Sequence, residues 1–357
     1  PISWNKNQYQ EGTNEYVAVR PELKKQIEEL YRKHPEEARD SFGEDPFEVK
    51  NILKYWVFSE KPEFHVIPTD TINIHIDKDA LLRSGIMLPK TIRHLKGEDL
   101  KDAIPDKLYI PLTDIRMLTK VDLLMLEMLA NCNWERPLYL AISVGSVSKL
   151  KFDNYFVQEG LAFRFTPFDY KKWGDVGENR LYAVDVERLY DNVMNRYKYG
   201  GLDTPGLYLD ETTLRTCWYH RRLFAQLAKE LIAQGDNERA KKVLAYAEQV
   251  IPGYNVPETH ESGSYDIATA YAALGEKTKA VTLAVHLIAE AEDYINWAFS
   301  LKGNRIEMVR NDCIYKFWQW NQYNELLKKI DGEKYKESNR RFEEKYALFA
   351  PTMNYKN

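Results

Sequence analysis

Two segments of the chain repeat each other at a constant offset of forty residues, and this repeat limits the possible folds more than any other feature of the sequence. The first copy has large and small apolar residues and one glycine at Leu227, Ala228, Leu231, Gly235, Ala240, Leu244 and Ala247, and the second has Ile267, Ala268, Tyr271, Gly275, Ala280, Ala284 and Leu287. Small residues let two helices cross closely, and large neighbours fill the remaining space. The repeat therefore predicts two helical hairpins over Thr213–Leu287, with Gly235 and Gly275 in equivalent turns.

These spacings resemble those of the tetratricopeptide repeat. Phe224, Leu227, Ala228 and Leu231 fit its first helix, and Ala240, Leu244, Ala247 and Pro252 fit its second. A usual repeat has about 34 residues, so about six extra residues must be placed somewhere. We expect them in the loop Tyr254–Ser264, which contains Pro257 and Gly263. The alternative is an ordinary pair of hairpins without internal symmetry.

The composition excludes several classes of protein. A formal net charge of −4 gives no general attraction to nucleic acid or to anionic lipid. The three cysteines, Cys132, Cys217 and Cys313, lack metal-binding spacing and do not form a disulfide framework. Apolar runs such as Leu138–Val144 are too short to span a bilayer. The chain begins at Pro1 rather than at methionine, which predicts a piece of a longer protein.

The order of the expected elements predicts an α+β chain of 357 residues, in which a small α/β unit precedes an all-α array of tetratricopeptide-like hairpins. The expected domains are a lead-in with helices at 1–59, the α/β unit at 60–182 and the helical domain at 183–357. Strands are predicted at Phe64–Pro68, Thr71–Ile76, Lys107–Pro111, Pro137–Val144 and Leu161–Pro167. Helices are predicted at Glu22–His34, Lys50–Phe58, Leu118–Trp134, Val184–Tyr199, Asp293–Leu301, Ile306–Ile330 and Lys334–Ala347.

Asp77 and Asp79 follow a predicted strand, as the metal-binding Asp-x-Asp of many sugar-nucleotide transferases does. The alternative is that one of them caps a helix beginning at Ala80. His65 and His75 lie on neighbouring predicted strands, but a metal site would need further ligands, and solvated histidines are the simpler interpretation. We therefore predict no catalytic residue, metal or cofactor in this chain.

The helical array offers a candidate binding groove. Side chains of the first helices that avoid the core are predicted to line its concave face: Arg222, Ala225, Gln226, Lys229, Ile232 and Ala233, with Ser262, Tyr265, Asp266, Thr269, Ala272 and Ala273 in the second copy. Arg222, Lys229, Tyr265 and Thr269 are the predicted binding residues, and their charge suits an acidic or carboxylate-ended peptide. A solvated face, or a groove filled by the α/β unit, is the alternative.

The joint Trp134-Glu135-Arg136-Pro137 connects the predicted long helix to an apolar strand, and a structural role is the default interpretation. With its flanks Asn131-Cys132-Asn133 and Leu138-Tyr139, this joint resembles that of a family of multipass membrane proteins common in Bacteroidetes. Their membrane part is similar to a lipid-linked-sugar glycosyltransferase, and a eukaryotic relative is a protein O-mannosyltransferase. Further matches are Glu159–Arg164, Asp210–Thr213, His220–Arg222 and Ile251–Pro257.

The resemblance implies that this chain is a soluble C-terminal tail on the periplasmic face of the inner membrane. It places the family's catalytic carboxylates in membrane-domain loops, outside this chain. The expected function is a non-catalytic scaffold that binds a protein or peptide segment, or the protein's own membrane domain, and positions acceptors. The rival hypothesis is a self-contained carbohydrate-active enzyme with its site around Asp77 and Asp79.

Overall fold

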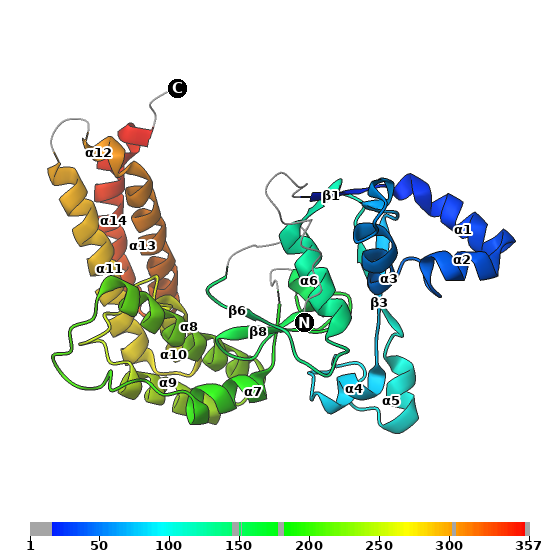
Figure 1. Cartoon of the computed structure of the whole chain (residues 1–357). Helices are drawn as coiled ribbons and strands as arrows, with labels where there is room; N and C mark the ends of the chain where they lie inside the picture. The colour runs from blue at the N-terminus through cyan, green and yellow to red at the C-terminus, as the bar shows by residue number, and fades with distance from the viewer. Residues whose placement is uncertain (1–15, 145–149, 151, 178–181, 302–304, 354–357) are drawn as a thin grey trace. The chain divides into compact units, whose positions relative to one another are not determined.

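A computed structural model of the chain describes residues 16–144, 150, 152–177, 182–301 and 305–353. It divides into two compact units, Pro1–Asp185 and Val186–Asn357, which are described separately below (Figure 1). Long helices and small sheets occur together, in agreement with the predicted α+β class. Residues 1–15 of the predicted lead-in lie outside the described residues.

The first unit contains three small sheets. One has the order β2-β1-β5, one is the hairpin-like pair β3-β4, and one has the order β6-β8-β7-β9. The strands are β1 (Tyr16–Val19), β2 (Val66–Ile67), β3 (Thr71–His75), β4 (Lys107–Pro111), β5 (Met117–Thr119), β6 (Tyr139–Ala141), β7 (Phe156–Gln158), β8 (Ala162–Phe165) and β9 (Ala183–Val184). The antiparallel register of β3 and β4 sets His75 opposite Lys107.

The predicted lead-in is a structural part of this unit. Its residues Tyr16–Val19 form β1, the central strand of the first sheet, and pair with both β2 and β5. Val17 and Val19 point into the core, so the alternation typical of a half-buried strand was present in a segment predicted to be merely extended. The extended conformation predicted for these residues is found, but the prediction did not include their pairing in a sheet.

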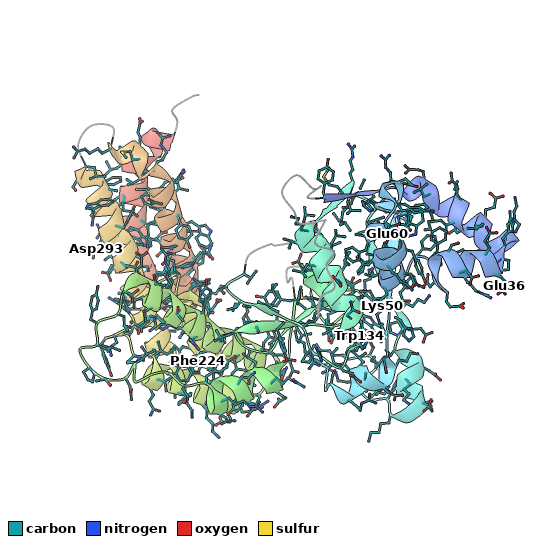
Figure 2. The ribbon with its side chains drawn as sticks, in the orientation of Figure 1. Glu36, Lys50, Glu60, Trp134, Phe224 and Asp293 are labelled. Atoms are coloured by element: carbon teal, nitrogen blue, oxygen red, sulfur yellow. The ribbon has the colours of Figure 1, made fainter. Side chains whose placement is uncertain are left out.

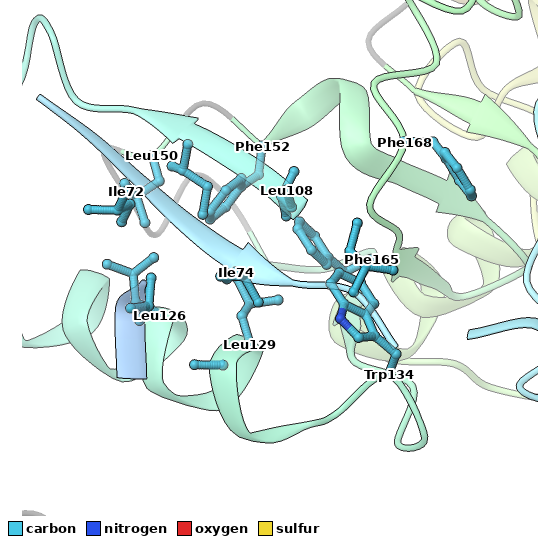
Figure 3. Close-up of a cluster of buried hydrophobic side chains, with 14 of the residues drawn as sticks. Ile72, Ile74, Leu108, Leu126, Leu129, Trp134, Leu150, Phe152, Phe165 and Phe168 are labelled. Carbon is cyan, nitrogen blue, oxygen red and sulfur yellow. The ribbon is translucent and has the colours of Figure 1, made fainter. Parts of the chain in front are cut away.

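Helices cover the sheets of the first unit. They are α1 (Lys24–Lys33), α2 (Pro35–Phe42), α3 (Val49–Ile52), α4 (Lys78–Arg83), α5 (Gly97–Ala103) and α6 (Lys120–Asn131). Thr119 and Asp122 start α6 with a capping box, in which each side chain accepts from the other residue's backbone N–H. Figure 3 shows Ile72 and Ile74 of β3 between α6 and aromatic side chains such as Phe152 and Phe165. All of these residues belong to one hydrophobic core.

In its described residues the second unit has helices joined by loops and no strand. Its helices are α7 (Val186–Asp191), α8 (Glu211–Ala233), α9 (Asn237–Val250), α10 (Ser264–Ala273), α11 (Lys277–Ser300), α12 (Arg305–Met308), α13 (Arg310–Ile330) and α14 (Gly332–Met353). Successive long helices pack on one another, with α8 on α9 and α10, α10 on α11, α11 on α13 and α13 on α14 (Figure 1). None of the helices within the described ranges is long and apolar enough to cross a membrane.

The two copies of the repeat have similar turns and similar small buried residues. Gly235 and Gly275 both have φ of 80°, a left-handed conformation that glycine adopts without strain. In the first turn the Asp236 N–H donates to the Leu231 carbonyl, and in the second the Glu276 N–H donates to the Tyr271 carbonyl, each at 2.9 Å. Ala240 and Ala280, at matching positions of the helices that follow, have no exposed surface.

Some helix bounds were predicted wrongly, among them those of the single helix expected at Ile306–Ile330, where the structure has α12 and α13. The segment Asp293–Leu301 was expected to form a helix of its own, but α11 runs without a break from Lys277 to Ser300. Between Leu287 and Asp293 the chain has only Ile, Ala and Glu, with no glycine or proline to end a helix. The second hairpin therefore has a second helix of 24 residues, ten more than the 14 of α9.

Candidate functional site

A polar pocket of about 390 Å³ lies beside the joint between α6 and β6. Its walls come from four places in the sequence: Asp45, Glu48 and Lys50 around the start of α3, His75 and Asp77 at the end of β3, Lys107 at the start of β4, and Asn133, Trp134 and Glu135 in the joint. The pocket thus brings together two groups that the sequence identified separately, the histidine and aspartate after β3 and the joint itself.

The backbone of the joint is strained. Asn133 and Trp134 have φ of 48° and 59°, in the left-handed region that residues other than glycine seldom adopt. Such a conformation costs roughly 1–3 kcal/mol per residue and persists only where surrounding contacts enforce it. Here Lys50 Nζ donates to Asn133 Oδ1 at 3.1 Å, so the turn is attached to α3 across 83 positions of sequence.

Trp134 fixes the joint against the core. Its indole Nε1 donates to the main-chain carbonyl of His75 at 2.8 Å. The ring stacks on Phe165 of β8, with centroids 6.4 Å apart, and only 6% of the residue's surface is exposed. Figure 3 shows the Trp134 ring beside Phe165 at the end of β3. The predicted structural role of Trp134 thus has a physical basis in these contacts.

An ion pair forms one wall of the pocket. Lys107 Nζ lies 2.7 Å from Asp45 Oδ2, and the Phe47 N–H donates to the other carboxylate oxygen at 3.0 Å. Burial acts to raise the pKa of Asp45, but the hydrogen bonds from Lys107 and Phe47 outweigh it, and the pKa lies below its usual value. The same hydrogen bond raises the pKa of Lys107. Both groups are therefore charged at neutral pH.

The two aspartates of the rival enzyme site have structural partners. Asp77 caps α4, with its Oδ1 accepting from the Ala80 N–H at 2.9 Å, as the helix-cap alternative predicted. Asp79 points elsewhere and lies 2.8 Å from Lys101, whose hydrogen bond lowers the pKa of Asp79. The two carboxylates therefore do not converge on one position.

The two histidines are also separate. His65 Nε2 lies 2.6 Å from the Ser59 carbonyl, whereas His75 lines the pocket. In the part of the chain that the structure describes, no group of three or more His, Cys, Asp or Glu residues could hold a metal ion.

The other three residues of the joint, Glu135, Arg136 and Pro137, have further contacts outside the pocket. Glu135 lies 3.9 Å from Arg83, and both side chains are mostly exposed. Arg136 and Pro137 line a second, small recess together with Trp134 and Arg164. Arg164 is buried and donates to the Ser84 carbonyl and side chain at 2.9 and 2.8 Å. The joint thus contributes both to the polar pocket and to the recess beside the buried Arg164.

Sequence reasoning missed the contribution of Asp45, Lys50 and Lys107. They reach the pocket from positions 45 to 107, and no local spacing connects them with the joint at 131–137. Of these three residues, only Lys107 was predicted to lie in a strand, as its first residue. The register of β3 against β4 brings it opposite His75, and that register is a tertiary property.

In the second unit, Arg221 holds the long loop between α9 and α10. Arg221 is 3% exposed, and its guanidinium donates to the carbonyls of Ile251, Val256 and Pro257 and to the Ser262 hydroxyl. Burial lowers the pKa of Arg221. The sequence identified the His-Arg-Arg segment but did not distinguish this buried residue from its exposed neighbour Arg222.

The four predicted binding residues lie on α8 and α10, two helices that pack together. Arg222 Nε donates to the Glu261 carbonyl at 2.6 Å, so part of its donor capacity is used within the chain. Lys229 is exposed two turns further along α8. Tyr265 is half-buried in an aromatic cluster, and Thr269 donates its hydroxyl to the Asp266 carbonyl.

Two residues expected on the open face are instead buried. Ala225 is 1% exposed, and Ser262 has no exposed surface because its hydroxyl binds Arg221 and Ser264. These two residues therefore do not contribute to an open face of the helices.

Aromatic side chains gather next to Arg222 and Tyr265. We define the aromatic cluster as His260, Tyr265, Tyr315, Trp318 and Tyr323. Tyr315 and Trp318 stack with centroids 5.6 Å apart and are 42% and 47% exposed. At the base of the cluster, His260 Nδ1 lies 2.7 Å from the hydroxyl of the buried Tyr323, and burial lowers the pKa of His260.

The cluster adjoins the predicted groove through two consecutive residues. His260 contacts Tyr265, Tyr315 and Trp318, and the next residue, Glu261, accepts from Arg222. Glu261 also receives a hydrogen bond from Gln319 of α13 at 2.9 Å. The guanidinium of Arg222 and the exposed rings of Tyr315 and Trp318 are thus linked through Glu261 and His260.

Comparison with known proteins gives one match. No curated protein and no solved structure matches the chain. A family model described as TMEM260-associated domain 2 matches residues 1–187, which is more than half of the chain and includes the joint and its pocket. The chain therefore belongs to the TMEM260-associated domain 2 family.

Proposed function

We propose that this chain is a non-catalytic accessory region of a larger membrane protein of the glycosyltransferase-like class, related to protein O-mannosyltransferases, and that it helps to position acceptor proteins. Membership of the TMEM260-associated domain 2 family supports this proposal, as does the resemblance of the joint at 131–139. In a Gram-negative cell the region lies on the periplasmic face of the inner membrane, next to its own membrane domain.

The proposed scaffold is the second unit, interpreted as a short tetratricopeptide-like array. The offset of forty residues, the buried Ala240 and Ala280 and the two glycine turns with the same hydrogen bond support this interpretation. Such arrays bind extended segments along the face formed by their first helices. In this chain those helices are α8 and α10, which carry Arg222, Lys229, Tyr265 and Thr269.

The exposed aromatic face of the second unit is the observation that carries the proposal. Tyr315 and Trp318 expose nearly half of their surface, and both contact His260, which also contacts Tyr265. Tyrosine, tryptophan and arginine are the residues most enriched at energetically important positions of protein interfaces. A polypeptide segment with acidic groups would contact the rings and pair with the cations. Because the face is small, we expect a Kd on the order of micromolar.

The experiment compares captured polypeptides between matched variants of the full chain. The double variant Tyr315→Ala and Trp318→Ala removes the exposed rings, and Arg222→Glu with Lys229→Glu reverses the charge beside them. The control is Trp297→Ala on α11, where the side chain is equally exposed at 50%. We expect the same periplasmic polypeptides to be lost with both test variants and retained with the control. Equal capture of polypeptides by all variants would contradict the proposal that this face binds them.

The rival function, a self-contained carbohydrate-active enzyme, is favoured by one observation. His75 and Asp77 line a pocket large enough for a small ligand. Against it, Asp77 caps α4 and Asp79 pairs with Lys101 outside the pocket, so no acid–base pair of carboxylates forms there. Release or transfer of sugar by the purified chain, abolished by Asp77→Asn, would establish the rival, because asparagine retains the cap but removes the charge.

A further inference from the structure

The second unit contains a cavity that shares no lining residue with the proposed polypeptide face. Its volume is about 130 Å³, and its walls come from α8, α9, α10, α11 and the loop that follows α9. Arg221 lines it from α8, one turn before Phe224, which is labelled in Figure 2. The polar side chains of the lining are those of Arg221, Glu248, Glu258 and Tyr271.

The rest of the lining is apolar and mostly buried. It consists of Leu244, Ala247, Ile251, Pro252, Gly253, Ile267 and Leu283. An apolar cavity of roughly 150 Å³ can hold a benzene molecule, which has six carbon atoms. The cavity between these helices is therefore large enough for a ligand of about five non-hydrogen atoms, and its walls suit a ligand that is apolar over most of its length.

Three of the four polar side chains have partners within the chain. The Nη hydrogens of Arg221 are donated to three carbonyls and to the Ser262 hydroxyl. The Tyr271 hydroxyl donates to Glu248 Oε1 at 2.5 Å, and Lys279 Nζ lies 2.9 Å from both oxygens of that carboxylate. The Nη donors of Arg221 are thus occupied, and the charge of Glu248 is balanced by Lys279.

Glu258 is the fourth polar side chain, and it is half-buried. Among the residues that the structure describes, none forms a hydrogen bond or an ion pair with its carboxylate. The carboxylate lies against Gly253, where a Cβ would be 2.5 Å from Glu258 Oε1. A carboxylate that is partly removed from water gains from a cationic partner.

The lining therefore combines an apolar interior with one carboxylate that can accept from a cation. We infer that this cavity binds a small alkylammonium group, with its stem against Leu244, Ile267 and Leu283 and its ammonium donating to Glu258. An anion would meet the carboxylates of Glu248 and Glu258, which is unfavourable. The positive charge of Arg221 opposes the bound cation, so we expect a Kd only on the order of millimolar.

This inference does not rest on the proposed function. The cavity is lined by none of the residues that are changed in the capture experiment. A negative result at the cavity would leave the polypeptide face unaffected, and the converse also holds.

The test titrates the full chain with n-butylammonium and follows the isoleucine δ1-methyl signals by NMR after ¹³C labelling. Ile251→Val and Ile267→Val each remove one δ1-methyl group and so assign the two signals from the cavity. The comparison probes are 1-butanol, which has the same stem without the charge, and butyrate, which has the opposite charge.

We expect saturable shifts of both signals with n-butylammonium, with Kd on the order of millimolar, and at least about tenfold weaker binding of 1-butanol and butyrate. The absence of a saturable shift with n-butylammonium would overturn the inference. Binding of 1-butanol or butyrate with an affinity within about tenfold of that of n-butylammonium would also overturn it, because the charge would then not be recognised.

Matched variants locate the binding. Glu258→Gln keeps the size of the side chain but removes its charge, and we expect about tenfold weaker binding of n-butylammonium. Gly253→Ala places a methyl group where the carboxylate lies, and we expect a similar loss because only the flexible end of Glu258 must move. The control is Glu238→Gln, an exposed carboxylate in the first turn of α9. Unchanged affinity in Glu258→Gln, or equal weakening in Glu238→Gln, would contradict binding in this cavity.

Discussion

The indole N–H of Trp134 donates to the main-chain carbonyl of His75 at 2.8 Å, and this bond joins the turn after α6 to the end of β3. The two residues are 59 positions apart in the sequence. Through this contact the joint, which resembles that of a membrane-protein family, becomes one wall of a pocket whose other walls come from β3, β4 and the start of α3.

Replacing Trp134 with phenylalanine tests that bond. Trp134→Phe keeps an aromatic ring against Phe165 but removes the donor, and we expect the free energy of unfolding to fall by about 1 kcal/mol. Urea denaturation of the full chain measures it. The control Trp297→Phe changes an exposed ring and should alter stability by less than about 0.5 kcal/mol. Equal values for both variants would mean that the bond contributes nothing.

Replacing the small residues at the helix crossings with larger ones should destabilise the second unit. Ala240→Leu and Ala280→Leu each place a bulky side chain where no surface is exposed, and we expect a cost of roughly 1–3 kcal/mol. Ala245→Leu, at an exposed position of α9, is the matched control and should be nearly neutral. Equal melting temperatures for all three variants and the wild type would contradict the packing described for the repeat.

Two consecutive arginines should differ strongly in their contribution to stability. Arg221→Met leaves the carbonyls of Ile251, Val256 and Pro257 without their buried donor, and we expect a loss of about 3 kcal/mol or more. Arg222→Met removes an exposed donor from one carbonyl and should cost less than about 1 kcal/mol. Chemical denaturation and limited proteolysis of the loop 251–263 measure the difference. Similar behaviour of the two variants would show that Arg221 does not organise the loop.

The second unit should lose stability as the pH falls below neutral. His220 lies between Tyr197 and Tyr199, and burial lowers its pKa in the folded state. The unfolded chain, with a histidine pKa of about 6.5, therefore binds more protons, and stability is lost as the pH falls from about 7 through 6.5 toward the folded-state pKa. We expect His220→Gln to reduce this dependence.

The control for that effect is His286→Gln, which changes an exposed histidine of α11 and should leave the pH dependence unchanged. His260, whose pKa is also lowered by burial, keeps part of the dependence in the first variant. Thermal denaturation of both variants between about pH 7 and pH 5 provides the comparison. An identical pH dependence in His220→Gln and the wild type would contradict the assignment.

Local patterns predicted the elements whose signal is contained within the element. The strand Lys107–Pro111 was predicted and found with the same bounds, because alternation along five residues is enough to define it. The two turns were likewise predicted from the positions of Gly235 and Gly275. By contrast, β1 was predicted only as part of an extended lead-in, since a strand of 4 residues gives little periodicity to detect.

The candidate site could be predicted only in part. Trp134 and Glu135 were identified from the joint, and His75 and Asp77 from the end of a strand, but nothing local indicated that they share a pocket. That depends on the Trp134–His75 bond and on the register of β3 and β4, which the sequence does not display. The aromatic cluster was missed for the same reason, because His260, Tyr265 and Trp318 belong to a loop and two helices.

The most direct test of the proposed function is photo-crosslinking from the aromatic face in the cell that makes the protein. A photoreactive phenylalanine analogue replaces Trp318 in one variant and Trp297 in the other, two positions with similar exposure. If the face around Trp318 holds acceptor proteins, irradiation should give discrete adducts of the chain with other polypeptides from position 318 and few from position 297. Equal adducts from both positions, or none from position 318, would contradict the proposal that this chain positions acceptors through its aromatic face.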